Sequence, residues 1–160
     1  MRLSELNAAP VQELTGELLA CCDVPSWAAM IIEKRPYDAV AGLLDSADAA
    51  ARSLTDDEVD RALAKHPRIG ERPTGQGTEA GWSRQEQSGV TPDDALVEGN
   101  RAYEERFGRV FLICATGLGK EQILAALHQR LTHDDETERG VVKDELRKIA
   151  LLRLGKLVTG

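Results

Sequence analysis

Apolar residues return every third or fourth position along almost the whole of this 160-residue chain. Val11, Leu14 and Leu18 form one such series, and another runs over residues 40–47. This spacing places the apolar side chains on one face of an α-helix. A chain of this length can bury a core of its own without metal or disulfide support. We therefore expect one all-α domain over residues 1–160, a bundle of about seven to eight helices with one long Gly/Pro-rich loop.

Prolines and caps divide this pattern into separate helices in the first half of the chain. Pro10 and Pro25 suit first helical turns, and Pro36 is expected to open a helix toward Ser53. Thr55 and the residue three positions later form a capping-box pattern for the next helix. The second half is expected to hold a short helical turn over 83–88, helices over 91–108, 120–131 and 135–158, and one strand-like run over 110–115.

The helical pattern stops at Pro67, because proline lacks an amide hydrogen and disfavours helical geometry in the residue before it. Residues 67–81 hold four glycines and two prolines within 15 positions. Loops of this length in compact domains usually carry function or are disordered. His66, at or just beyond the helix end, therefore borders the first place to look for a site.

Three polar side chains each allow more than one interpretation. An imidazole at His66 can act as a general acid or base, or can simply cap the helix by its favourable interaction with the dipole. Glu86 can complete a capping box with Ser83, or can place a carboxylate near His66. Arg153 stands on an apolar helical stripe, so its guanidinium needs a buried ion pair, a ligand carboxylate or an outward path.

Composition and spacing argue against several classes of partner. A net charge of −7, from 20 basic and 27 acidic residues, disfavours binding to nucleic acid or an anionic membrane. Three cysteines without a C-x-x-C spacing indicate neither a disulfide framework nor a zinc site. No apolar window approaches a membrane span and no secretion signal is visible, so we expect a soluble, cytoplasmic protein.

Two apparent ligand motifs also fail on their spacing. Residues 117–120 suggest a phosphate loop, but Cys114 stands where that motif needs glycine and Glu121 where it needs serine or threonine. His128 and His133 are five positions apart and do not share one helix face, so we interpret them as surface and turn residues. We expect no metal site.

Four features occur in the order seen in one known family. They are His66-Pro-Arg-Ile-Gly70; Trp82-Ser-x-x-Glu86-Gln87-x-Gly89; Tyr103-x-x-x-Phe107-Gly108 with Phe111-Leu-Ile-Cys-Ala115; and Leu146 with Leu152-Arg153-Leu154. On these motifs the chain resembles, over nearly its full length, the decarboxylases of 2-oxo-4-hydroxy-4-carboxy-5-ureidoimidazoline (OHCU) in urate degradation. It departs from them at Arg109-Val110, where many members have an aromatic-proline pair, and at residues 115–119, which replace a more basic turn.

The resemblance implies an all-α homodimer that converts OHCU to (S)-allantoin and CO2 without a cofactor. It implies catalytic roles for His66 and Glu86. It further implies substrate contacts from Pro67, Ser83, Gln87, Arg153 and the backbone amides around Phe111, Leu112 and Ile113. Two alternatives stay open: a non-enzymatic helical interaction module, and a decarboxylase of the same frame that acts on a related ureido acid.

Overall fold

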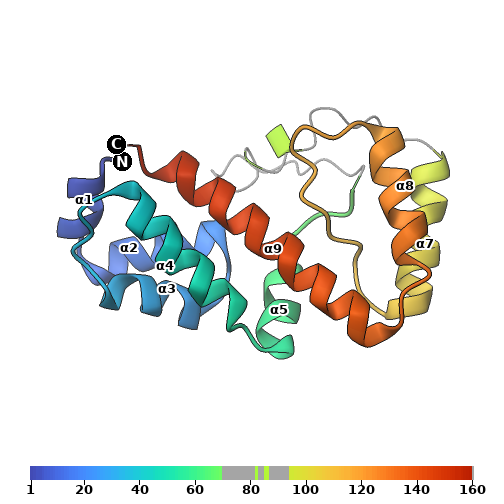
Figure 1. Ribbon diagram of the computed structural model, residues 1–160, viewed down its shortest axis with the longest axis horizontal. Helices are drawn as coiled ribbons and strands as arrows, with labels where there is room; N and C mark the ends of the chain where they lie inside the picture. The colour runs from blue at the N-terminus through green and yellow to red at the C-terminus, as the bar shows by residue number, and fades with distance from the viewer. Residues whose placement is uncertain (70–81, 83–84, 87–93, 160) are drawn as a thin grey trace. The chain divides into compact units, whose positions relative to one another are not determined.

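The computed structural model describes residues 1–69, 82, 85–86 and 94–159, and its regular secondary structure there is entirely helical (Figure 1). This confirms the all-α prediction for the described part of the chain. The helices with assigned bounds are α1 (Leu3–Ala8), α2 (Val11–Cys21), α3 (Pro25–Glu33), α4 (Val40–Arg52), α5 (Asp56–Leu63), α7 (Asp94–Phe107), α8 (Lys120–Arg130) and α9 (Asp135–Leu157). None of these described helices is both long and apolar enough to cross a bilayer.

The chain divides into two compact units, and we describe each by itself. The first comprises Met1–Ala62 with Leu146–Gly160, and the second comprises Leu63–Glu145. Helix α9 therefore contributes its first half to the second unit and its second half to the first unit. The expectation of one domain over residues 1–160 stays a prediction.

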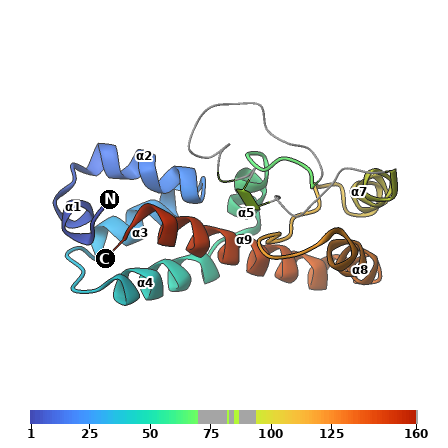
Figure 2. The ribbon, with the colours of Figure 1, turned by 90° about the horizontal axis from the view of Figure 1, so that it is seen from above.

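In the first unit, α3 packs against both α2 and α4 (Figure 2). Trp27 on α3 is fully buried, and its indole N–H donates to the Ala47 carbonyl on α4 at 3.1 Å. The two ends of the chain meet in the same unit, because the Met1 ammonium donates to the Leu157 carbonyl at 2.7 Å and the Thr159 amide donates to the Met1 carbonyl. Long-range contacts thus close this unit around an apolar core.

The proline predictions hold to different degrees. Pro25 occupies the first turn of α3 as expected, whereas Pro10 is the N-cap residue of α2. The prediction that Pro36 opens a helix is wrong, because α4 begins only at Val40. The backbone N–H and carbonyl of Tyr37 are both bonded to the Asn7 side chain, at 2.8 and 2.9 Å, and so are fixed outside a helix.

The predicted capping box at the start of α5 is confirmed. The Thr55 amide donates to Glu58 Oε1 at 2.9 Å, and the Glu58 amide donates to Thr55 Oγ1 at 3.2 Å. The Ser26 hydroxyl also donates to the Glu58 carboxylate. That hydroxyl and then the Thr55 amide hold the pKa of Glu58 below its usual value of 4.5, since both favour the charged form.

Glu58→Gln should therefore lower the free energy of unfolding at pH 7 by about 0.5–2 kcal/mol, the usual worth of a cap. A depressed carboxyl pKa stabilises the fold above the unfolded-state pKa, and this contribution is lost as the pH falls through the folded-state pKa. The deficit should then shrink in urea denaturation curves recorded at successively lower pH. Asp57→Asn, in the same turn, is the matched control, and an equal deficit at all pH values would contradict the prediction.

In the second unit, α7 packs against α8. The contact is close at Gly99, where a Cβ atom would stand 3.1 Å from Leu127 Cδ1 on α8. The buried residues of this core are Ile69, Leu96, Tyr103, Phe111, Ile113, Ala115, Ile123 and Leu127. The core therefore combines two helices with two non-helical segments, one beside His66 and one over residues 111–115.

Candidate active site

His66 lies just beyond the end of α5, as its proline neighbour predicted. The helix ends at Leu63, and the His66 amide donates to the Leu63 carbonyl at 3.0 Å. The side chains of His66 and Pro67 are both half-buried. His66 thus stands at the end of a helix and is partly accessible, where its imidazole can reach a bound proton donor or acceptor.

Helix α7 holds the residues that follow His66. The Arg68 guanidinium lies 2.7 Å from Glu104 Oε1, and Asn100 Nδ2 donates to the Ile69 carbonyl at 2.8 Å. Ile69 itself is buried in the core of the second unit. Two side chains one helical turn apart, together with one apolar anchor, therefore fix this segment on α7.

Glu86 lies with Trp82 and Gln85 in helical geometry, as the expected short turn requires. Its side chain is only 9% exposed. Glu58, whose capping role is established above, is half-exposed by comparison. Burial of a carboxylate is costly unless it is hydrogen-bonded or paired, so a carboxylate at this position has to be held by polar partners. Ser83 and Gln87 lie outside the described residues.

Residues 110–115 were predicted to be strand-like, but they pair with no strand in the described structure. Instead, side chains satisfy their backbone. The Leu112 carbonyl accepts from Arg130 Nη1 at 2.7 Å, and the Cys114 amide donates to Glu145 Oε1 at 3.1 Å. Phe111 and Ile113 are buried in the same core as Ile69, so the structure brings the segment beside His66 and residues 111–115 onto one core.

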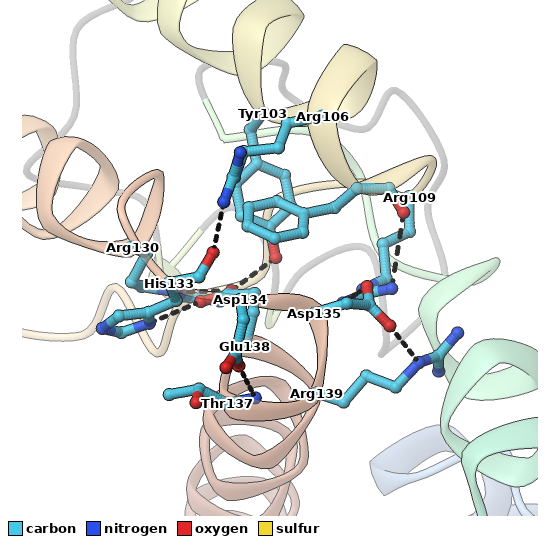
Figure 3. Close-up of polar contacts among 11 residues, drawn as sticks. Tyr103, Arg106, Arg109, Arg130, His133, Asp134, Asp135, Thr137, Glu138 and Arg139 are labelled. Atoms are coloured by element: carbon cyan, nitrogen blue, oxygen red, sulfur yellow. Dashed lines mark hydrogen bonds and ion pairs between the residues drawn. The ribbon is translucent and has the colours of Figure 1, made fainter.

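A buried ionic network supports this region (Figure 3). Glu138 on α9 is fully buried and accepts from Arg130 Nε and Nη2 at 2.8 and 2.6 Å, and from the Tyr103 hydroxyl at 2.5 Å. Burial, followed by the bond to Glu138, raises the pKa of Tyr103, so its hydroxyl stays a donor. His133 Nδ1 lies 3.1 Å from Glu138 Oε1. His128 is exposed and His133 lies in the turn that follows α8, as predicted, although the prediction did not include the contact of His133 with Glu138.

The sequence interpretation did not single out Arg130, Glu138 or Glu145. The sequence did indicate that the two glutamates are buried. Glu138 and Glu145 fall seven positions apart on the apolar helical stripe that continues to Ile149. Charged residues at core positions of a helix are almost never fully buried unless they are paired. The same argument that drew attention to Arg153 applies to both glutamates.

Arg109, at one of the departures from the family pattern, is turned toward the start of α9. Its Nη2 atom lies 3.1 Å from Asp135 Oδ1, and its guanidinium stands 5.5 Å from the centre of the Phe107 ring (Figure 3). Arg109, which stands where many family members have an aromatic residue, thus makes an ion pair and an aromatic contact.

Arg153 belongs to the first unit, whereas His66 and Glu86 belong to the second. Its side chain is 1% exposed, as its place on the apolar stripe predicted, and Nη1 donates to the Ala20 carbonyl at 3.3 Å. The guanidinium does not snorkel to solvent. Whether it also binds a ligand stays a prediction.

Among the described residues, no three His, Cys, Asp or Glu side chains are grouped so that they could hold a metal ion.

Comparisons with known proteins agree over most of the chain. A family model described as OHCU decarboxylase matches residues 7–155. The 2-oxo-4-hydroxy-4-carboxy-5-ureidoimidazoline decarboxylase of Amia calva is 30% identical over 168 residues, which cover 99% of this chain and 95% of that protein. The uric acid degradation bifunctional protein of Bacillus sp. (strain TB-90) is 27% identical over 98% of this chain. The chain spans only 32% of that bifunctional protein.

The fold also has a counterpart among solved structures. The crystal structure of an OHCU decarboxylase in the presence of (S)-allantoin aligns with a TM-score of 0.69 and 23% identity, over 88% of this chain and 96% of that chain. Likeness at this identity shows a shared helical fold.

Proposed function

Because this chain belongs to the OHCU decarboxylase family, we propose that it decarboxylates OHCU to (S)-allantoin and CO2 in urate degradation. The observation that carries the proposal is the packing of two segments on one core. One follows His66 and includes Ile69, and the other includes Phe111 and Ile113. His66, three residues before Ile69, and the non-helical segment over 111–113 are thus both next to residues of the same core.

The chemistry of the reaction matches these groups. Decarboxylation breaks the bond between the carboxylate and the ring carbon that carries the hydroxyl. The remaining electron pair is delocalised into the adjacent C=N bond, so the substrate is its own electron sink. The protein has to orient the carboxylate, stabilise charge that develops on the ring and deliver a proton to one face.

We assign proton transfer to His66 and the positioning of His66 and the substrate hydroxyl to Glu86. The half-exposed imidazole and the buried carboxylate support these roles. The remaining contacts are proposed from the family motifs. Ser83, Gln87 and Arg153 bind substrate polar groups, Pro67 contacts the substrate, and the backbone amides of residues 111–113 bind the ring carbonyls.

If the guanidinium also binds a planar substrate group, Arg153→Lys should raise the KM for OHCU clearly while the thermal stability changes little. A lysine ammonium cannot reproduce the bidentate fork of arginine. Steady-state kinetics and thermal unfolding of the same preparation measure the two effects. Severe destabilisation with an unaltered KM in the residual folded protein would assign Arg153 a purely structural role.

Activity should survive exhaustive dialysis against EDTA, and the protein should show no pyridoxal phosphate or flavin absorbance. The reason is that the substrate itself accepts the electron pair. Loss of activity on dialysis, restored by one specific divalent metal, would overturn this prediction.

We also propose, from the resemblance alone, that the protein is a homodimer that works in the cytoplasm. Light scattering coupled to size-exclusion chromatography measures the first property, and a molar mass of one chain would contradict it.

The decisive experiment uses OHCU made freshly from urate. The protein should accelerate the decay of OHCU absorbance, and the circular dichroism of (S)-allantoin should grow at the same rate. The uncatalysed product should be racemic, because the planar intermediate accepts a proton from bulk water on either face. Unchanged decay would favour an interaction module. Accelerated decay with racemic product would retain the decarboxylase but remove His66 as a stereospecific proton donor.

A further inference from the structure

The segment over residues 110–115 has no helix or sheet to satisfy its peptide groups, so side chains take that place. Arg130 donates to the Leu112 carbonyl at 2.7 Å, and Glu145 accepts from the Cys114 amide at 3.1 Å. Both anchors are buried, at 5% and 8% exposure. Hydrogen bonds to ionised groups are about twice as strong as those between neutral groups. Two such bonds, two residues apart, therefore fix the course of this backbone.

The Arg130 guanidinium is itself held in one orientation. Nε and Nη2 both donate to Glu138 Oε2, at 2.8 and 2.6 Å, and the Tyr103 hydroxyl donates to the same oxygen (Figure 3). The guanidinium also stands 4.6 Å from the centre of the Phe111 ring. Because the fork is planar and rigid, its own two bonds to Glu138 determine where Nη1 points. Helices α8 and α9 thereby determine the position of the Leu112 carbonyl.

Stability alone is a weak reason for such an arrangement. A buried ion pair between Arg130 and Glu138 costs desolvation of both charges, and well-packed apolar side chains often serve a core equally well or better. An apolar side chain at position 130, however, could not bond a carbonyl in a non-helical segment. What the ion pair adds to this core is a fixed backbone at residues 111–115.

We propose that Arg130 and Glu145 are positioning residues, which hold Leu112 and Cys114 so that residues 111–113 present their amides to the substrate ring. This inference rests on the proposed function, in which the amides of residues 111–113 bind the ring carbonyls. Neither side chain needs to touch the substrate. A misplacement of about 1 Å at a binding group can cost on the order of 10²-fold in rate, even when its cause is remote.

Arg130→Lys is the first test, with Tyr103→Phe as the matched control. Lysine keeps the positive charge beside Glu138, but its compact ammonium cannot hold the carboxylate and the Leu112 carbonyl in the geometry of the fork. We expect the KM for OHCU to rise and kcat/KM to fall by about 10–100-fold. Tyr103→Phe removes a hydrogen bond from the same carboxylate but leaves the bond from Arg130 to Leu112, so its KM should stay near that of the unmodified protein.

A second pair of variants keeps the test decisive if Arg130→Lys does not fold. Glu145→Gln retains an oxygen that accepts from the Cys114 amide, whereas Glu145→Met has a similar length and no such acceptor. We expect a raised KM for Glu145→Met and rescue by Glu145→Gln. Inhibition by (S)-allantoin, measured on all variants, should weaken in parallel with substrate binding.

The outcomes separate the two proposals. An unmodified protein that does not decarboxylate OHCU overturns the proposed function, and the inference falls with it. An active protein whose folded Arg130→Lys and Glu145→Met variants keep an unchanged KM overturns the inference alone. An equal loss in Tyr103→Phe also overturns it, because the loss would then follow the general stability of the network.

Discussion

His66→Gln should stay folded and lose about 10²–10⁴-fold in turnover of OHCU, the usual contribution of a general acid or base. Glutamine keeps hydrogen-bonding capacity at this position but cannot exchange a proton near neutral pH. The substitution leaves in place the His66 backbone amide, which bonds the Leu63 carbonyl at the end of α5, and His66 is only half-buried. Steady-state kinetics and circular dichroism of the same sample separate activity from folding.

His128→Gln supplies the control for this prediction. His128 lies on α8 with an exposed side chain, so the same substitution there should leave turnover unchanged. Near-normal turnover by a folded His66→Gln variant would remove the imidazole from the mechanism and would support its simpler role at a helix end.

Glu86→Gln should lower turnover by about 10²-fold or more while the free energy of unfolding changes by no more than about 2 kcal/mol. The substitution preserves the shape of the side chain and much of any capping geometry, but removes the charge that would orient His66 and the substrate hydroxyl. A buried carboxylate, 9% exposed, is where such a charge acts most strongly on its neighbours.

Glu58→Gln is the matched control for Glu86→Gln, since Glu58 is a glutamate of the same capping pattern with both reciprocal bonds in place. It should lower stability and leave turnover intact. If Glu86→Gln behaves in the same way, Glu86 is a cap and the catalytic assignment is wrong.

Local features of this protein were predictable because the groups that determine them lie within one turn of each other. Thr55 and Glu58 are three residues apart and bond each other directly. Pro67 acts on the residue immediately before it, which places His66 beyond the end of α5. Arg153 is buried because its neighbours at helical spacing are apolar.

The family motifs suggested roles for the candidate site residues that residue spacing alone left open. Spacing left His66 and Glu86 each with a capping interpretation and a catalytic one, because helix ends and acid–base sites use the same residue types. Four motifs in register selected one family, and the family model confirmed that membership. The individual site roles stay predictions that the variants above test.

The sequence by itself determined that the fold is helical, where several helices begin and that charged side chains stand on apolar stripes. Tertiary structure alone decided their partners. Nothing local distinguishes Leu112 as the carbonyl that Arg130 bonds, or Asn7 as the side chain that keeps Tyr37 out of a helix. Residues 110–115 have the composition of a strand, yet two of their peptide groups are hydrogen-bonded to the buried side chains of Arg130 and Glu145 and not to a second strand. Any strong donor or acceptor satisfies a buried peptide group, so only the packing of distant helices determines which one it meets.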